Sequence, residues 1–439
     1  MKTSHRCNVT QLLLLLLLPA CSGMGLPGLG YGQLDPAVLH EEVFAESYRR
    51  LSVYHVDPVS LSALVPKGLE KLNTLNPSAN IPQILASLPA PGPEDWQGWA
   101  HVTMQTVAAA KITAPPDQIY SAILPGIMGP LDDFSHYIPP EDSLSAHEWR
   151  SGYGGIGVTF EKKDNRFVIL DVFIGSPAEK AGLLAGEIAH AINGQDLATV
   201  GAKDFATLVR GEPGTQLTLL VGKEGAAPRP VTLTRERVVP TTVALTMKGD
   251  MAVIRISRFE PATVNEFRNA ARQAQWNHAK AVVLDLQHNP GGNLNSATAI
   301  AALLVPEGAV AETRGRHPAA SDTYTADGTD ILIGLPLVVL MDGHSASASE
   351  VLAAALHDRH RARLVGSASF GKGTVQNVAP LPNGGELAVT WARLLPPSGQ
   401  SFIGRGLQPD ICLPRPVTPC PKADDIRALA LPAAEKMVN

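Results

Sequence analysis

The sequence predicts a multidomain α+β protein in which a helical region comes first, a small β domain second and an α/β domain last. Apolar residues recur at helical spacing as far as about residue 125, short β-type runs begin at Gly152, and strands and helices alternate beyond Pro240. The 439 residues suffice for two or three domains. With 45% hydrophobic and 18% charged residues, the composition is that of a globular protein.

Residues 1–21 have the features of an export signal. Two basic residues precede the leucine run Leu12–Leu18, which is too short to span a bilayer as a helix. Leu18–Cys21 resembles a bacterial lipobox, in which Cys21 would become the lipidated first residue of the mature chain, although Pro19 is unusual there. We therefore expect an extracytoplasmic, periplasmic protein, with a lipid anchor at the membrane preferred over plain signal cleavage.

Residues 22–150 are predicted to be mostly helical. After a Gly/Pro-rich linker, Val43, Tyr48 and Leu51 recur at helical spacing. A second apolar stretch covers 119–127, and a proline cluster at 89–93 predicts a break between two halves.

Residues 151–238 are predicted to form a compact β domain. Ser176 is placed to cap a short helix that Gly182 ends, with proline in its first turn. Strands are expected at 156–160, 167–172, 188–192 and 217–221, and a second helix at 203–209.

Residues 239–415 are predicted to form the α/β domain, and residues 416–439 a tail that is proline-rich and then helical. The alternation of strands and helices indicates a layered α/β arrangement. Strands are expected at 251–256, 281–286 and 335–341, and helices at 262–275, 295–304 and 348–357.

A serine-rich run lies where the third of these strands meets the next helix. Backbone N–H groups at a helix start can stabilise an oxyanion, so chemistry is preferred for Ser347. Capping of the helix, with Glu350 completing a capping box, is preferred for Ser345 or Ser349.

Lys372 is a candidate base for this serine. Serine needs an adjacent base to act as a nucleophile, and a lysine can serve if burial keeps its amine neutral. Lys372 lies between two glycines in an expected strand, and even spacing would place Gln376 on the same face. A phosphate-binding loop is rejected because Gly373 stands where that motif needs a Ser or Thr, and because a strand is expected after it where the motif needs a helix. A penicillin-binding Ser369-x-x-Lys372 pair is rejected because the flanking glycines disfavour the helical turn that it requires.

Two glycine-rich turns are candidate binding sites. Asn289–Gly292 closes the second α/β strand, where a ligand could approach the main chain, although an ordinary turn is equally compatible with the spacing. The run 152–158 opens the β domain, and its backbone could converge N–H groups on a peptide carboxylate.

Cys412 and Cys420 lie close together in a proline-rich segment, where an oxidising compartment would allow a disulfide; two free thiols are the alternative. His357 and His360 lie in an Asp/Arg-rich stretch that favours a solvated helix face over a zinc site, so no metal and no cofactor is expected. The net charge of −5 without a basic block argues against nucleic acid as a partner.

Taken together, these motifs resemble the carboxyl-terminal processing, or tail-specific, proteases of the serine–lysine type. The resemblance covers most of the chain after the signal. Beyond the residues named above, it includes Tyr54–Pro58, Leu131–Tyr137, Ser176–Leu183, Ala191–Gly194, Asp285–Gly292, Phe370–Gln376, Ser398-Gly399 and Gly406–Asp410. Gln287 departs from the family, which often carries arginine there, and His344 is also unusual.

The resemblance implies roles for particular residues. Ser347 would be the nucleophile, Lys372 its general base and Gln376 the partner that orients the lysine. The N–H of Ala348, with that of Gly291 or Gly292, would form the oxyanion hole. The β domain would be a PDZ domain that captures substrate C-termini through Gly154, Gly155, Ile156 and Gly157.

We therefore expect a serine endopeptidase that cleaves proteins near flexible C-termini through an acyl-enzyme. Its partners would be such proteins; an adaptor protein and the oligomeric state are left open. The alternative is a catalytically inactive PDZ-containing binding or scaffold protein of the same fold. A cell-wall hydrolase or β-lactam target would depend on the rejected Ser369-x-x-Lys372 pair.

Overall fold

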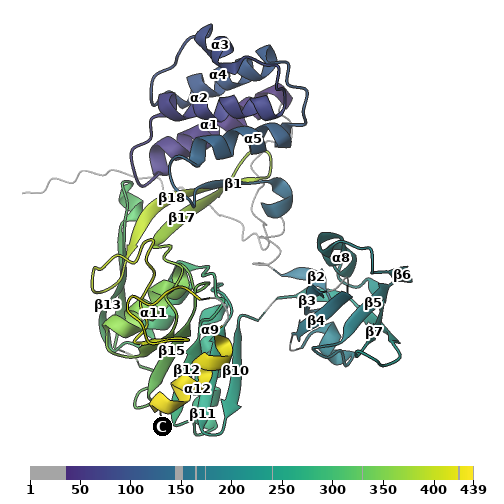
Figure 1. The fold of residues 1–439 in the computed structure, drawn as a ribbon, viewed down its shortest axis with the longest axis vertical. Helices are drawn as coiled ribbons and strands as arrows, with labels where there is room; N and C mark the ends of the chain where they lie inside the picture. Colours follow the sequence, from purple (N-terminus) through teal and green to yellow (C-terminus); the bar gives the residue numbers. More distant parts are fainter. Residues whose placement is uncertain are drawn as a thin grey trace, which may run out of the picture.

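A computed structural model of the chain describes residues 36–143, 152–163, 166–173, 175–239, 241–328, 330–423 and 426–438. The export signal and Cys21 lie outside these residues. The expected multidomain α+β class is confirmed: a helical region, a β domain and a mixed α/β domain follow one another along the chain (Figure 1). No helix among the described residues has both the length and the apolar character needed to cross a membrane.

Between Pro36 and Met128 the structure describes five α-helices and one 3-10 helix of the helical region. Its core contains Phe44, Tyr48 and Trp99, and it continues into Leu387 and Val389 of a strand far along the chain, so the region packs directly on the α/β domain. The elements are α1 (Pro36–Tyr54), α2 (Leu61–Glu70), η1 (Lys71–Thr74), α3 (Ile81–Ala86), α4 (Trp96–Ala109) and α5 (Pro116–Met128).

The α/β domain is built on a six-stranded sheet. In spatial order its strands are β10 (Val243–Lys248), β11 (Met251–Ile256), β12 (Ala281–Asp285), β15 (Leu337–Met341), β16 (Arg363–Gly366) and β19 (Ile411–Cys412). All neighbours are parallel except β10 and β11. Parallel sheets are covered on both faces: α9 (Thr263–Trp276), α10 (Leu294–Ala302) and α11 (Ala348–Asp358) cover one, and α12 (Arg427–Val438) covers the other.

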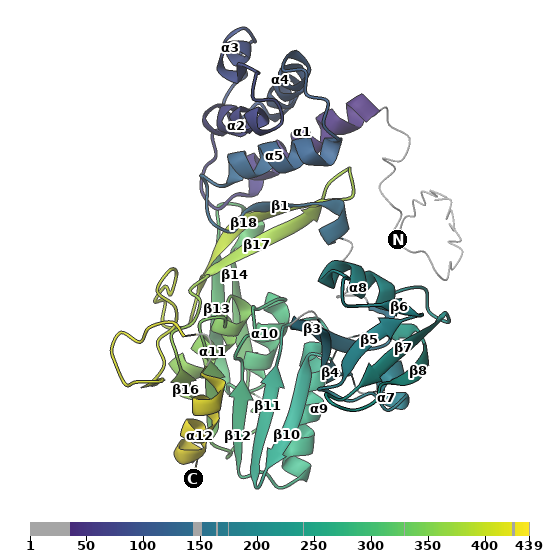
Figure 2. The same cartoon turned by 45° about the vertical axis from the view of Figure 1, so that its right-hand side comes forward.

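A second sheet joins this domain to the helical region. Its path is β1 (His136–Ile138), β18 (Glu386–Leu395), β13 (Glu307–Arg314) and β14 (Asp322–Asp327), with β17 (Thr374–Pro380) also paired to β18. The helices α1–α5 lie over the β1, β17 and β18 end of this sheet (Figures 1 and 2).

The β domain lies beside the α9 and β10 edge of the α/β domain (Figure 2), and a pocket is lined from both sides by Phe173, Val243 and Ala270, among others. Ser176 caps a short helix as expected, since its Oγ accepts the N–H of Glu179 at 3.2 Å. The elements are β2 (Tyr153–Gly155), β3 (Val158–Lys163), β4 (Arg166–Val172), α7 (Pro177–Lys180), β5 (Ile188–Ile192), β6 (Gln195–Asp196), α8 (Ala202–Val209), β7 (Gln216–Gly222), β8 (Arg229–Thr234) and β9 (Glu236–Val238).

Candidate active site

Three loops meet at one edge of the six-stranded sheet. They follow β12, β15 and β16, which are consecutive parallel strands, so their carboxyl ends lie side by side. Such edges are where open α/β sheets bind ligands. The first loop contains Asn289–Gly292, the second leads to Ser347, and the third leads to Lys372. The parallel register therefore gathers motifs that are distant in the sequence.

The buried carboxylate of Glu350 joins the second loop to the third. Its Oε2 accepts the backbone N–H groups of Ser347 at 2.7 Å and Lys372 at 3.0 Å. Its Oε1 accepts the Ser369 hydroxyl and the Gly371 N–H, both at 2.6 Å. Burial raises the pKa of Glu350, although these four hydrogen bonds oppose the shift. Glu350 is thus more than the capping residue that the sequence suggests.

Ser347 occupies the N-cap position of α11 with a φ of 56°. A non-glycine residue with positive φ is uncommon and, when held by its surroundings, is typical of functional sites. The expectation that Ser345 or Ser349 caps the helix was wrong. Their hydroxyls instead donate to Leu286 O at 2.8 Å and Asn289 O at 2.9 Å, which ties the serine run to the loop after β12.

Gly291 and Gly292 allow that loop to pass directly against Ser347. A Cβ at Gly291, which has a φ of 99°, would lie 2.9 Å from Ser347 Cβ and 3.0 Å from Ala348 N. A Cβ at Gly292 would lie 2.2 Å from Phe259 O. Only glycine therefore allows this approach at either position.

The backbone N–H groups of Gly291 and Ala348, which lie where the loop after β12 passes Ser347, differ in their hydrogen bonding. Gly291 N–H donates to Asn289 Oδ1 at 2.9 Å. Ala348 is the first residue of α11, where a backbone N–H has no acceptor within its own helix. The two glycines are thus not equivalent as candidate oxyanion donors.

Lys372 lines a pocket of about 460 Å³ at this site. Its Nζ lies 5.3 Å from the centroid of the Phe134 ring. Burial lowers the pKa of Lys372, while the charges of Glu350 and Asp132 act in the opposite direction. The pocket is lined by Phe134, His288, Pro290, His344, Ala346, Phe370 and Lys372.

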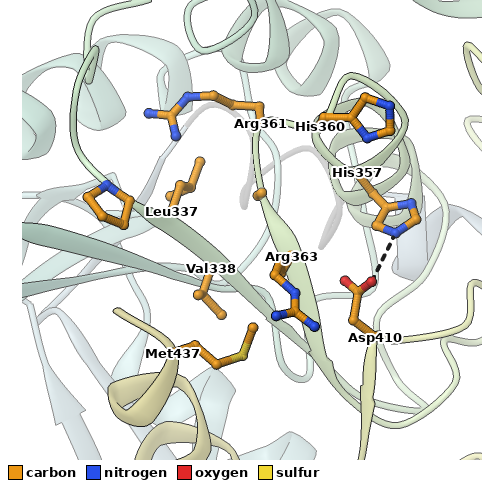
Figure 3. Close-up of a pocket in the computed structure, with 10 residues that line it drawn as sticks. Leu337, Val338, His357, His360, Arg361, Arg363, Asp410 and Met437 are labelled. Atoms are coloured by element: carbon orange, nitrogen blue, oxygen red, sulfur yellow. Dashed lines mark ion pairs between the residues drawn. The ribbon is translucent and has the colours of Figure 1, made fainter. Parts of the chain in front are cut away.

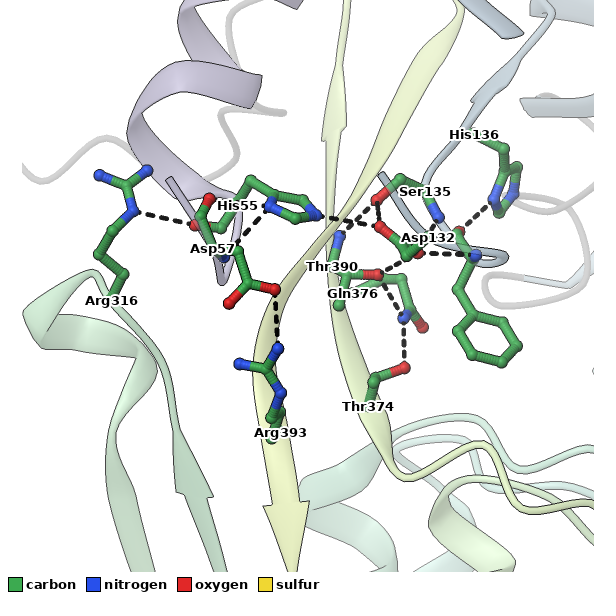
Figure 4. A network of polar contacts seen from close by, with 11 residues as sticks. His55, Asp57, Asp132, Ser135, His136, Arg316, Thr374, Gln376, Thr390 and Arg393 are labelled. Carbon is green, nitrogen blue, oxygen red and sulfur yellow. Dashed lines mark hydrogen bonds and ion pairs between the residues drawn. The ribbon is translucent and has the colours of Figure 1, made fainter. Parts of the chain in front are cut away.

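The expectation that Lys372 lies in a strand was wrong, because β17 begins only at Thr374 and Gly373 has a φ of 53°. Even spacing therefore does not place Lys372 and Gln376 on a common face. Gln376 does lie in β17, and its Nε2 is 3.0 Å from Thr374 Oγ1 and 3.2 Å from Thr390 Oγ1 (Figure 4).

Comparisons with known proteins identify the family to which the chain belongs. The family model of peptidase family S41 matches residues 250–413, and that of the PDZ domain matches residues 168–222. A carboxy-terminal-processing protease of Bartonella bacilliformis is 31% identical over 73% of this chain and 76% of its own. The chain belongs to the carboxy-terminal-processing proteases of family S41.

Two further relatives show how far the similarity extends. A probable CtpA-like serine protease of Staphylococcus aureus is 32% identical over 68% of the chain, which spans only 61% of that protein. Among solved structures, a photosystem II D1 C-terminal processing protease has a TM-score of 0.47 and 26% identity, covering 85% of this chain and 92% of its own.

Backbone hydrogen bonds join the glycine run 154–157 to other segments of the PDZ domain. Gly154 lies in β2, and its carbonyl accepts the Gly211 N–H at 3.0 Å. The Ile156 carbonyl accepts the Ala178 N–H, and the Gly157 carbonyl accepts the Phe173 N–H, both at 2.9 Å. These contacts hold the run from Gly154 through Gly155, Ile156 and Gly157 beside the start of β3.

The C-terminal segment of this S41 peptidase lies against two of the active-site loops. A disulfide joins Cys412 and Cys420. Just beyond it, Pro421 O accepts the Ala368 N–H at 3.2 Å and Ala423 O accepts the Gly343 N–H at 2.9 Å. The loops that lead to Ser347 and Lys372 are therefore supported by the tail.

A second pocket, of about 340 Å³, lies away from these loops, and none of the candidate catalytic residues lines it (Figure 3). His357 faces Asp410 there, with Nε2 3.4 Å from a carboxylate oxygen. Among the described residues, no group of three or more His, Cys, Asp or Glu side chains is arranged to hold a metal.

Two residues near the site escaped functional interpretation from the sequence. The sequence links Asp132 to the family resemblance but indicates no role for it. In the structure its carboxylate contacts His55 of the helical region and Thr390 of the α/β domain. Gln287, where the family often has arginine, is fully buried, and its amide has no hydrogen-bond partner among the described residues.

Proposed function

We propose that the chain is a serine endopeptidase that cleaves protein substrates near their C-termini, with Ser347 as nucleophile and Lys372 as general base. The observation that carries this proposal is the shared anchoring of the two residues by Glu350, together with the burial of Lys372 in a largely apolar pocket. Burial lowers the pKa of Lys372 and thus favours the neutral amine that a base requires.

In the first chemical step, neutral Lys372 takes the proton of Ser347 as its Oγ bonds to the scissile carbonyl carbon. The carbonyl π electrons move to oxygen, and the N–H groups of Ala348 and Gly292 stabilise the resulting oxyanion. Gly292 is preferred over Gly291 because the Gly291 N–H already donates to Asn289. Gln376 orients Lys372 during this transfer.

Collapse of the tetrahedral intermediate breaks the C–N bond, and protonated Lys372 gives its proton to the leaving amine. An ester on Ser347 remains. Water then adds to this ester, Lys372 accepts the water proton, and release of the serine hydroxyl completes hydrolysis. Each proton taken by Lys372 is returned within the cycle, so no cofactor is required.

We further propose that the PDZ domain holds the substrate's terminal carboxylate at Gly154–Gly157 while an upstream peptide bond enters the active site. The glycine-rich start and the neighbouring strand β3 suit capture by β-addition. The sequence of residues 1–21 supports export to the periplasm, with Cys21 as the candidate lipid attachment site.

Catalysis is tested with the full mature chain and a reporter protein that ends in an unstructured apolar tail. Ser347→Ala and Lys372→Ala should each lower kcat at least about 10³-fold while both variants remain folded, as thermal unfolding would show. Ser62→Ala and Lys280→Ala, which change exposed residues of the same types, serve as matched controls. Cleavage at the wild-type rate by either active-site variant would refute the mechanism. Peptide binding without turnover by the wild-type chain would favour the binding-protein alternative.

Substrate capture is tested separately by amidating the C-terminus of the reporter. Loss of the carboxylate should raise KM at least tenfold with little change in kcat, because the scissile bond is remote from the removed charge. Equal KM values for the free and amidated reporters would exclude carboxylate capture by the PDZ domain.

A further inference from the structure

A buried polar network links the helical region to β17 and β18 of the α/β domain (Figure 4). Its centre is Asp132, in the loop after α5. Asp132 Oδ2 lies 3.0 Å from His55 Nε2 and accepts the Ser135 hydroxyl at 2.6 Å. Asp132 Oδ1 accepts the Thr390 hydroxyl at 2.8 Å and the N–H groups of Phe134 at 2.7 Å and Ser135 at 2.8 Å.

The direction of these hydrogen bonds determines which way the Gln376 amide faces. The Thr390 hydroxyl has one hydrogen, and it is donated to the Asp132 carboxylate. Thr390 Oγ1 can then only accept, so the part of Gln376 that lies 3.2 Å away must be the NH₂ group. The other amide hydrogen faces Thr374 Oγ1 at 3.0 Å. Both donors of Gln376 are thus occupied, and its Oε1 is left as an acceptor.

We infer that Asp132 is a positioning residue that acts through Thr390 to hold the Gln376 amide with its oxygen available to Lys372. The inference rests on the proposed function, in which Gln376 orients the catalytic lysine. An amide in the opposite orientation would present two N–H donors, which cannot accept a hydrogen bond from the lysine amine. Without Asp132, the Thr390 hydroxyl is free to donate to Gln376, which allows that inverted orientation.

The ionised state of Asp132 supports this direction of bonding. Burial would raise the pKa of Asp132, but hydrogen bonds from His55, Ser135, the Phe134 N–H and Thr390 hold it well below its ordinary value. A carboxylate without a proton can only accept, so it keeps the Thr390 hydrogen directed toward itself.

His55 and Ser135 connect the helical region to this polar network. His55 lies just after α1 and is buried; its Nδ1 lies 2.9 Å from Asp57 O and 3.1 Å from Asp57 N, and its Nε2 lies 3.0 Å from Asp132 Oδ2. Ser135 Oγ also accepts the Thr390 N–H at 3.0 Å. The helical region therefore takes part in arranging the active site of the α/β domain.

Charge and positioning predict opposite effects when Asp132 is neutralised. The Asp132 charge raises the pKa of Lys372. If this charge were the only role of Asp132, its removal would favour the neutral Lys372 amine, and kcat at neutral pH would stay equal or rise. Loss of the amide orientation would instead lower kcat. The sign of the change in Asp132→Ala, which removes both the charge and the acceptor, therefore distinguishes the two roles.

The experiment measures kcat, KM and thermal unfolding of the full mature chain for Asp132→Ala, Thr390→Val, Thr390→Ser and the double variant Asp132→Ala/Thr390→Val. Alanine is used because asparagine would keep an acceptor oxygen for the Thr390 hydroxyl. Asp132→Ala and Thr390→Val should each lower kcat about 10- to 100-fold, part of the 10²- to 10⁴-fold that a positioned base contributes, with KM unchanged. The double variant should be no worse than the poorer single variant, because both changes break one relay. Thr390→Ser, which keeps the hydroxyl, should recover most of the loss.

Asp133→Ala is the matched control, since Asp133 is the exposed neighbour of Asp132 and should tolerate the same substitution. The inference is overturned if Asp132→Ala keeps kcat within twofold of wild type. It is also overturned if the single losses multiply in the double variant, or if Thr390→Ser is as impaired as Thr390→Val. Should Asp132→Ala fail to fold, the contrast between the two Thr390 variants decides alone.

Ser347→Ala and Lys372→Ala are measured in the same assay. If they retain activity, the proposed function fails, and the relay fails with it. If they are inactive while Asp132→Ala and Thr390→Val are fully active, the relay alone is wrong.

Discussion

The backbone N–H groups of Ser347 and Lys372 donate to the same oxygen, Oε2 of Glu350, at 2.7 and 3.0 Å. A single buried carboxylate therefore sets the spacing between the start of α11 and the loop before β17. The other oxygen holds Ser369 and Gly371, so Glu350 contacts three residues of the third loop.

Glu350→Gln should lower both activity and stability. Glutamine has one acceptor oxygen where Glu350 has two, so one pair of donors would face an NH₂ group. An unsatisfied buried donor costs about 1–3 kcal/mol, and we expect the free energy of unfolding to fall by about 2 kcal/mol or more. Chemical denaturation and kcat measurements check this, with the exposed Glu94→Gln as control. Unchanged stability and kcat would show that Glu350 does not organise the site.

The pH dependence of kcat/KM should report the loss of a proton from Lys372. The protonated amine cannot act as a base, so kcat/KM rises with pH through its pKa. Burial lowers the pKa of Lys372, which places this rise below the value of about 10.4 for a free lysine. A profile measured from pH 5 to 11 checks the position, and a rise centred at or above 10.4 would contradict burial of the base.

The lowered pKa of Lys372 should also make the stability of the protein depend on pH. Between the lowered pKa of folded Lys372 and that of the unfolded chain, the unfolded state binds more protons, so the free energy of unfolding increases with pH. Lys372→Met removes this term. The stability of wild type relative to Lys372→Met should therefore improve as pH rises through this window, as urea unfolding at several pH values would reveal; a constant difference would argue against the shift.

Gly291→Ala should impair catalysis more than folding. Its Cβ would meet Ala346 O at 2.7 Å and Ser347 Cβ at 2.9 Å, so the nucleophile must move. Small displacements of reacting groups can cost about 100-fold in rate. Gly334→Ala is the matched control, because Gly334 also has positive φ, 82°, but a Cβ there meets nothing within 4 Å. Equal kcat for the two variants would show that the close approach is irrelevant to catalysis.

Cys420→Ser should loosen the tail that supports the active-site loops. Closing so short a loop is worth about 2–3 kcal/mol by chain entropy, and Cys420 lies beside Pro421 and Ala423, which bind Ala368 and Gly343. We expect a lower unfolding temperature and a lower kcat for the variant. Wild-type protein treated with a reductant should change in the same direction. A variant with unchanged kcat would separate the tail from catalysis.

Much of the architecture could be predicted from local patterns. The expected helix 348–357 agrees with α11, and Ser176 caps its helix as its position suggested. Lys372 was misplaced, because the glycines beside it permit an irregular backbone that no strand periodicity describes. Ser345 and Ser349 were misassigned because their partners, Leu286 and Asn289, are remote in the sequence.

By itself, the sequence determined the order of the helical, β and α/β regions and many of their strands and helices, because periodicity and turn chemistry act over a few neighbours. The candidate roles of Ser347, Lys372 and Gln376 came from the resemblance of their motifs to a family. Tertiary structure decided which carboxylate joins Ser347 to Lys372, how deeply the lysine is buried, and how Asp132 reaches Gln376 through Thr390. Those features depend on the parallel register of distant strands and on packing of the helical region against β18, and pairing across such separations leaves no local periodicity to detect.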